Sequence, residues 1–187
     1  MVAPTVPPGR YTSIAIILHW FVALLVVVQF GLGWGMQEIA KKPPGPRAEA
    51  YNLHKSLGLT IFALMALRVA WRARHAPPAL PPMPRWQARL ATATHALLYV
   101  ALVAMPAAGY LGSAFSGYPV RFFGLALPTW SSPNPGLKDL MSGVHLWLSW
   151  ALAAAFAAHL AGVAKHAFID RDGLLRRMSW KAAPPTS

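Results

Sequence analysis

One apolar stretch near the C-terminus places the strongest constraint on how this chain folds. Residues 141–168 read MSGVHLWLSWALAAAFAAHLAGVAKHAF, a run long enough to cross a bilayer as a helix. His145, His159 and His166 interrupt this run. Ionisable side chains inside a membrane are costly and usually serve a function, so these histidines are expected to have partners on neighbouring helices.

Helical geometry brings two of these histidines onto one face. His145 and His159 are 14 residues apart, which corresponds to about 21 Å along a helix and about 40° around it. One helix therefore presents an imidazole near each side of a membrane, and this arrangement predicts the shared wall of two stacked haem sites. His166 shares the face, but it lies about 31 Å from His145. We therefore expect His166 at the cytoplasmic membrane interface.

The composition indicates an integral membrane protein. Of 187 residues, 56% are hydrophobic and 12% are charged, which is far from the average for soluble proteins. The absence of cysteine excludes thiolate-held iron–sulfur clusters, disulfides and thioether-attached haem, so an iron cofactor has to be held by histidine. The net charge of +12 comes from Lys and Arg residues at the ends of apolar runs. This placement is typical of a membrane protein and argues against nucleic-acid binding.

Further apolar runs predict a membrane bundle of four helices within a single domain, residues 1–187. The expected helices cover residues about 13–36, 53–71, 87–111 and 141–168. Polar, proline-containing stretches separate them, and the longest connection is expected from Gly112 to Leu140. The predicted fold is all-α, with helices running up-down-up-down around two stacked b-type haems.

Lys and Arg are more numerous at one end of this predicted bundle. That end holds Arg10, Arg72, Arg74, Arg85, Arg89, Lys165, Arg171, Arg176, Arg177 and Lys181. The other end holds Lys41, Lys42, Arg47, Lys55, Arg121 and Lys138. Because cytoplasmic segments carry the excess of Lys and Arg, both termini are predicted to be cytoplasmic.

The other predicted helices carry histidines at matching depths. His54 opens the second helix at the shallow outer depth of His145, so these two form one candidate axial pair. On the cytoplasmic side, His19 and His95 both lie near the depth of His159. Depth alone does not decide which of them pairs with it. A haem held by two imidazoles has no open coordination position, so the predicted function is electron transfer across the membrane.

An interval of 14 residues recurs on the other helices. Arg68 follows His54 by this interval, which places its guanidinium at the depth of the second haem, where a haem propionate is a suitable partner. Gly33 and Gly109 lie at the outer depth and would let the outer haem approach their helices. Close helix packing explains the glycines equally well. Any single histidine also has the ordinary alternative of a hydrogen bond to a neighbouring helix.

The chain resembles the bacterial cytochrome b561 family of di-haem inner-membrane proteins. The resemblance rests on motifs that occur in this order: AIILHWFVALLVV, NLHKSLGLTIFALMALRVAWR, ATHALLYVALVAMPAAGYL, FFGLALP, VHLWLSWALAAAFAAHLAGVAKH and DRDGLLRRM. It implies that His19 and His159 hold the cytoplasmic-side haem b. It likewise implies that His54 and His145 hold the periplasmic-side haem b.

The resemblance also implies a donor and an acceptor for the electrons. Family members pass electrons from a periplasmic donor to the quinone pool, and one branch oxidises superoxide and reduces ubiquinone. Basic residues on the outer side suit a small anionic donor. On the cytoplasmic side, His95 and His166 are candidates for binding a quinone carbonyl or supplying protons. The expected partners are membrane lipid, quinone and the anionic donor.

Two other functional classes fit the same pattern. A di-haem membrane-anchor subunit of a dehydrogenase or hydrogenase would receive electrons from a partner redox subunit and would have a similar number of helices and a similar use of histidine. A non-redox membrane module for metal binding or packing is the other class. A reduced-minus-oxidised absorption spectrum separates this last class from the two redox classes.

Overall fold

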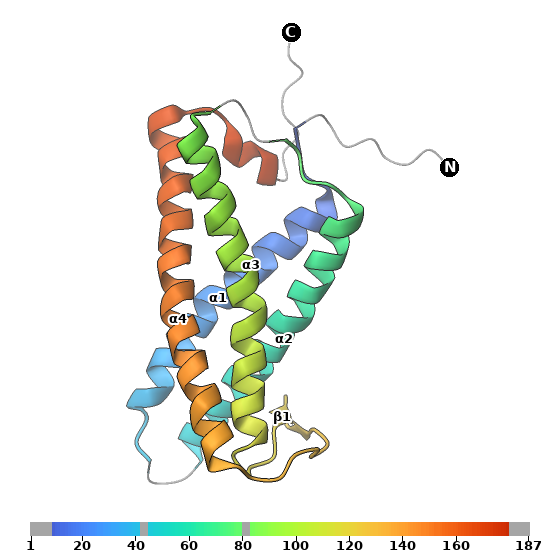
Figure 1. Ribbon diagram of the computed structural model, residues 1–187, viewed down its shortest axis with the longest axis vertical. Helices are drawn as coiled ribbons and strands as arrows, with labels where there is room; N and C mark the ends of the chain where they lie inside the picture. The colour runs from blue at the N-terminus through green and yellow to red at the C-terminus, as the bar shows by residue number, and fades with distance from the viewer. Residues whose placement is uncertain (1–8, 42–44, 80–82, 180–187) are drawn as a thin grey trace, which may run out of the picture.

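Four long helices make up most of the computed structural model, which describes residues 9–41, 45–79 and 83–179 (Figure 1). The helices are α1 (Ser13–Glu38), α2 (Pro46–Arg74), α3 (Arg85–Ala114) and α4 (Pro135–Ala164). Each is long and apolar enough to cross a membrane. The prediction of an all-α membrane bundle with four helices is confirmed.

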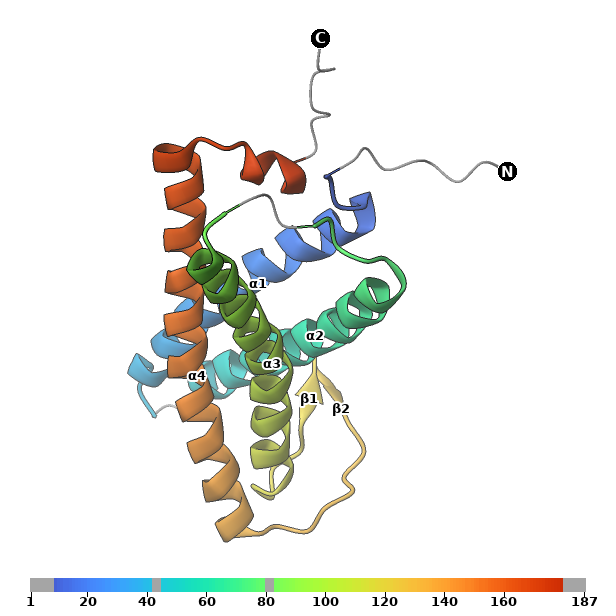
Figure 2. The ribbon, with the colours of Figure 1, turned by 45° about the horizontal axis from the view of Figure 1, so that its top comes forward.

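The helices run in alternating directions, and the two ends of the bundle differ. One end carries residues 9–12, the end of α2, the start of α3 and residues 165–179, and we call it the terminal end (Figures 1 and 2). The opposite end carries the end of α1, the start of α2 and the α3–α4 connection, and we call it the hairpin end. The helices pack mainly in successive pairs, α1 with α2, α2 with α3, and α3 with α4.

A small apolar core lies at mid-height between α1 and α2. Val22 and Val26 of α1 pack with Ile61 and Met65 of α2, and all four are at most 4% exposed. Partly buried side chains of α3, including Tyr99, cover this cluster. The core therefore separates the histidines near the terminal end from those near the hairpin end.

The helices are longer than the apolar runs that predicted them. α2 begins at Pro46 instead of about residue 53, and α4 begins at Pro135 instead of about residue 141. In both helices the proline occupies the first turn, where its missing N–H removes no helical hydrogen bond. The Asn134 side chain caps α4 by accepting the Leu137 N–H at 3.0 Å. Apolar periodicity marks the membrane-embedded part of a helix and does not record these polar first turns.

The chain folds back across the terminal end after α4. The last turn of α4 widens into the π-helix η1 (Lys165–Asp170), and the 3-10 helix η2 (Leu174–Met178) then crosses toward α1 (Figure 2). The Met178 carbonyl accepts the Trp20 indole N–H at 2.8 Å. Arg10 donates to the Ser179 carbonyl at 2.7 Å. These bonds tie the two ends of the described chain together over the bundle.

A two-residue hairpin lies against α2 at the opposite end. Strands β1 (Arg121–Phe122) and β2 (Leu125–Ala126) pair antiparallel, and Phe123 and Gly124 between them both have positive φ, as a type I′ turn requires. The Ser56 hydroxyl, 1% exposed, accepts the Phe123 N–H at 2.9 Å and donates to the Asn52 carbonyl at 2.8 Å. Ser56 thereby fixes the hairpin on α2 near His54.

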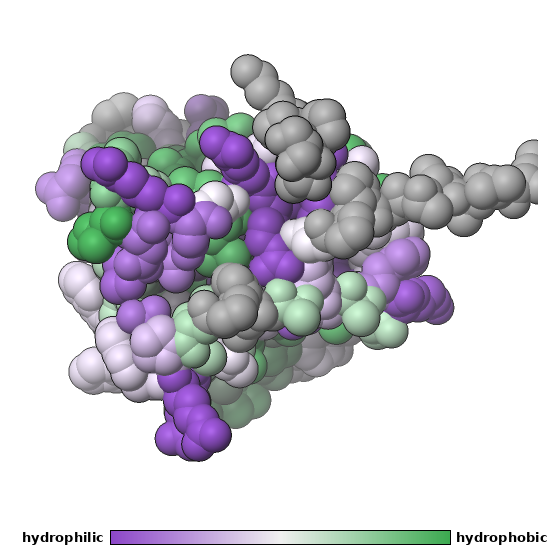
Figure 3. All heavy atoms as spheres, turned by 90° about the horizontal axis from the view of Figure 1, so that it is seen from above, coloured by the Kyte–Doolittle hydropathy of each residue, from purple (hydrophilic) through white to green (hydrophobic). Residues whose placement is uncertain are grey.

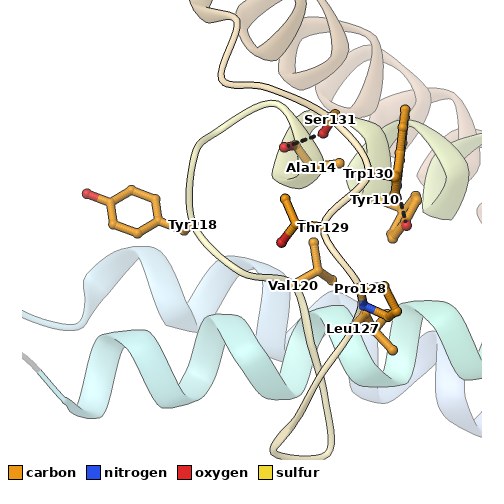
Figure 4. A pocket seen from close by; sticks show the side chains of 9 residues that line it. All are labelled: Tyr110, Ala114, Tyr118, Val120, Leu127, Pro128, Thr129, Trp130 and Ser131. Carbon is orange, nitrogen blue, oxygen red and sulfur yellow. Dashed lines mark hydrogen bonds between the residues drawn. The ribbon is translucent and has the colours of Figure 1, made fainter.

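The rest of this connection passes over the end of α3. Trp130 donates its indole N–H to the Tyr110 hydroxyl at 2.7 Å, and Ser131 donates to the Ala114 carbonyl at 2.9 Å (Figure 4). Figure 4 also shows the small pocket that these residues line, with the Tyr118 ring directed away from it. These contacts hold the long connection against the hairpin end.

The surface has the distribution expected of a membrane protein. Large apolar side chains are exposed along the helices, among them Leu24, Leu67, Val100 and Trp147. Hydrophilic side chains gather at the terminal end, which Figure 3 shows face-on. Basic residues counted toward the orientation cluster there, whereas Lys42 and Lys181 lie outside the described residues.

Candidate functional site

His54 of α2 and His145 of α4 face each other near the hairpin end. Their ring centroids are 6.1 Å apart, and the ring planes differ by 78°. Because a metal–imidazole bond is about 2 Å long, two imidazoles on opposite sides of one metal ion have centroids about 6 Å apart. The two side chains therefore have the spacing of a bis-imidazole metal centre.

The backbone of α3 fixes the orientation of His145. Its Nδ1 lies 2.9 Å from the Met105 carbonyl oxygen. A carbonyl only accepts hydrogen bonds, so Nδ1 carries the proton and Nε2 keeps a lone pair for a metal. Gly109 lies beside the ring, and a Cβ atom there would be 2.9 Å from Nδ1. A larger residue at this position would push the imidazole aside.

Gly33 of α1 has the corresponding role beside His54. A Cβ atom at Gly33 would lie 3.3 Å from His54 Cε1. The sequence left two explanations open for Gly33 and Gly109, approach of a haem or close helix packing; in the structure both glycines leave room for an imidazole. His54 Nδ1 is buried and has no hydrogen-bond partner within the described part of the chain.

Near the terminal end, three helices contribute histidines to one cluster. The ring centroids of His19 (α1) and His159 (α4) are 6.3 Å apart, with planes 71° apart. His95 (α3) lies closer to His159, at 5.3 Å and 61°. The His19–His159 separation fits the spacing of about 6 Å for two imidazoles on one ion, and the His95–His159 separation is shorter. Geometry thus favours His19 as the partner of His159, with His95 beside them.

Basic and phenolic side chains border this cluster. Arg68 of α2 donates from Nη1 to the Ala15 carbonyl, one turn before the α1 histidine, and from Nε to the Tyr99 hydroxyl, both at 2.9 Å. Arg68 and Arg72 each lie 5.6 Å from the centre of the Tyr99 ring. The sequence pointed to Arg68 at this depth. For two further residues the sequence carries only a spacing as a signal: Arg72 lies four residues after Arg68, and Tyr99 lies four residues after His95.

His166 lies apart from both clusters, on η1. Its Nδ1 is 2.6 Å from an Asp172 carboxylate oxygen and 3.3 Å from an Asp170 oxygen, and Lys165 pairs with Asp170 at 2.5 Å. Desolvation would raise the pKa of Asp172, but hydrogen bonds from the Leu174 backbone and from His166 outweigh it and lower that pKa. The sequence predicted the interfacial position of His166 but did not single out its two aspartate partners.

Comparison with known proteins gives one consistent set of relatives. Residues 10–181 match the family model described as prokaryotic cytochrome b561. The chain is 35% identical over 181 residues to cytochrome b561 homolog 2 of Escherichia coli strain K12, covering 94% of each chain. It is 30% identical over 177 residues to cytochrome b561 homolog 1 of the same organism, covering 91% of this chain and 97% of the relative. A probable superoxide oxidase CybB of Yersinia pestis is 27% identical over 171 residues, covering 90% of this chain and 95% of the relative.

Proposed function

Because the chain belongs to the prokaryotic cytochrome b561 family, whose members bind b-type haem and transfer electrons across the inner membrane, we propose that it oxidises superoxide outside and reduces ubiquinone. The proposal includes two haems, one for each histidine pair. The observation that carries it is the spacing of the pairs, 6.1 Å and 6.3 Å between ring centroids, with α4 contributing one imidazole to each.

Four histidines are the proposed haem ligands. His54 and His145 would hold the haem near the hairpin end, and His19 and His159 would hold the one near the terminal end. Bound haem supplies a reversible one-electron iron couple. Two histidine ligands for each haem would favour electron transfer over binding of oxygen. Arg68, with its guanidinium near the terminal-end pair, is the proposed partner of a haem propionate.

The terminal end is proposed to face the cytoplasm and the hairpin end the periplasm, in accordance with the excess of Lys and Arg at the terminal end. At the hairpin end, basic side chains outnumber acidic ones and would attract a small anion. These basic side chains are Lys41, Arg47, Lys55, Arg121 and Lys138. The relative described as a probable superoxide oxidase supports superoxide as that anion.

Ubiquinone is proposed to bind at the terminal end. Reduction of a quinone consumes protons as well as electrons, so the site needs groups that carry protons. His95 adjoins His159 and is suited to donate to a quinone carbonyl. His166 is hydrogen-bonded to Asp172, an exposed carboxylate, and is suited to pass protons from the cytoplasm to the site.

Superoxide-dependent reduction of ubiquinone by the purified protein, with haem content measured on the same sample, tests this proposal. We expect two haems b per chain and turnover that stops when superoxide is removed enzymatically. Full haem content without turnover would contradict the superoxide assignment and favour a membrane-anchor subunit that receives electrons from a partner protein. A preparation without a b-type absorption band would contradict the haem assignment itself.

A further inference from the structure

A buried amide lies in the middle of the apolar helix α1. Gln29 is 7% exposed and belongs to a membrane-spanning segment. A polar side chain at this depth is costly unless its hydrogen bonds are satisfied. Gln29 therefore requires an explanation that the packing of apolar residues around it does not provide.

The amide nitrogen of Gln29 has a hydrogen-bond partner among the described residues, and the amide oxygen does not. Gln29 Nε2 donates to the His54 carbonyl at 2.9 Å. It packs at Gly58, where a Cβ atom would lie 3.4 Å from Nε2. Gln29 Oε1 is buried and has no hydrogen-bond partner among the residues that the structure describes. The side chain thus connects α1 to the α2 segment that carries His54 and retains a free acceptor.

The unpaired donor that this acceptor could serve lies on the same histidine. His54 Nδ1 is also buried without a partner in the described chain. It lies 3.7 Å from the position of a Cβ atom at Gly33, one helical turn after Gln29 on the same face of α1. The Cβ direction in a helix points back toward the N-terminus, which is the direction of Gln29. An orphaned acceptor and an orphaned ring nitrogen therefore belong to the same contact, where α1 meets the α2 segment that carries His54.

The nearby polar group of α2 is already committed. The Ser56 hydroxyl donates to the Asn52 carbonyl and accepts the Phe123 N–H. Ser56 thus serves the hairpin, whereas Gln29 Oε1, beside the same α2 segment, is an unpaired acceptor among the described residues.

We propose that Gln29 is a positioning residue that adjusts the reduction potential of the hairpin-end haem. This proposal rests on the proposed role of His54 as a haem ligand. A histidine that binds iron through Nε2 carries its proton on Nδ1, and Gln29 Oε1 accepts a hydrogen bond from this N–H group directly or through one buried water. An acceptor on the second ring nitrogen raises the basicity of the ligand and fixes the ring. A more basic ligand stabilises ferric over ferrous iron, so Gln29 lowers the reduction potential of this haem.

Redox titration of full-length haem-loaded protein tests the proposal through a variant pair with opposite expected signs. Gln29→Leu removes the acceptor and should raise the potential of the hairpin-end haem. A tenfold change in the ferric-to-ferrous equilibrium would appear as about 59 mV for a one-electron couple. Gln29→Glu, titrated at a pH high enough to ionise the new carboxyl, supplies a stronger acceptor and should lower the potential. The haem that is lost in His145→Ala identifies which titration step to follow.

Controls separate this role from a general effect on packing. The other haem should keep its potential in both variants. Gln37→Leu removes an amide from the same helix, one that bonds to Tyr51 at 3.1 Å instead of to His54, and should leave both potentials unchanged. Shifts of the same sign in Gln29→Leu and Gln29→Glu, or no shift in either, would overturn the role of Gln29 and leave the proposed function intact. Wild-type protein without a haem at the hairpin end would overturn the proposed function.

A second measurement needs no variant. A high-resolution structure of the haem-loaded wild-type protein should show Gln29 Oε1, or one water bound to it, within hydrogen-bonding distance of His54 Nδ1. His54 Nδ1 bonded to any other group would overturn the proposal, even where a Gln29 variant fails to fold.

Discussion

The hairpin-end histidine pair and the terminal-end histidine cluster have different surroundings. At the hairpin end, His54 and His145 pack against glycines, and a backbone carbonyl orients His145. At the terminal end, the cluster contains a third histidine, His95, and is bordered by Arg68 and its phenolic partner. One site is shaped by small residues and backbone groups, and the other by charged and protonatable side chains.

This difference indicates that the two sites have different roles in electron transfer. Close packing around His145 fixes the ring and leaves little room for other groups, which suits a site that only passes electrons onward. Protonatable side chains around His159 suit a site where electron transfer is coupled to proton transfer and where haem propionates need cationic partners. The following predictions test this contrast, beginning with the largest expected effect.

Removing an axial ligand should abolish one site and spare the other. We expect His145→Ala or His54→Ala to lose only the hairpin-end haem, and His159→Ala or His19→Ala only the terminal-end haem, because each pair is separated from the other by the apolar core. Haem-to-protein ratios and redox titrations of the purified variants measure this. The proposed pairing is wrong if His95→Ala removes a haem while His19→Ala retains both.

Replacing a glycine that packs against an imidazole should weaken haem binding only at the hairpin-end site. A Cβ atom at Gly109 would lie 2.9 Å from His145 Nδ1, so Gly109→Ala should reduce occupancy of that haem several-fold, although alanine favours a helix by roughly 1 kcal/mol. Gly33→Ala, with 3.3 Å to His54 Cε1, should have a smaller effect. Gly31→Ala is the matched control because, among the described residues, no atom beyond the nearby α1 backbone lies within 4 Å of its Cβ position. Equal haem content in Gly109→Ala and Gly31→Ala would contradict the proposed role of this packing.

Removing the half-buried guanidinium of Arg68 should change only the terminal-end site. Arg68→Ala is expected to retain both haems and to lower the potential of the terminal-end haem, because a nearby cation favours the added electron. A tenfold shift of the equilibrium corresponds to about 59 mV. Arg68→Lys, which keeps the charge, should restore part of the shift. Unchanged potentials in a redox titration of Arg68→Ala would show that this side chain serves packing alone.

The smallest predicted effect concerns proton supply through His166. Asp172→Asn should leave haem content and potentials unchanged and slow quinone reduction a few-fold, because it removes the carboxylate bonded to the His166 ring. The pKa of Asp172 is lowered, so its charge is fully present above the ordinary carboxyl pKa of about 4 and is lost only as pH falls through the lowered value. The defect should therefore persist throughout the neutral range in a stopped-flow assay. An equal rate for Asp172→Asn and wild type would exclude this route.

The sequence predicted the helices and the depth of each histidine because both follow from the spacing of residues along one helix. Depth along the helices left the choice between His19 and His95 open, since that choice depends on ring separations between helices, and only the family resemblance implied His19. Gln29 was missed because a single amide in an apolar run has no spacing signal. Asp170 and Asp172 were missed because their contact with His166 requires the π-helix and the reversal at Arg171, whose φ is 52°.

Native mass spectrometry of the purified wild-type protein tests most directly whether the chain holds two haems, one in each histidine pair. We expect a mass equal to one chain plus two haems b, and the loss of one haem in either His145→Ala or His159→Ala. A wild-type mass with one haem or none would contradict the assignment of two haems.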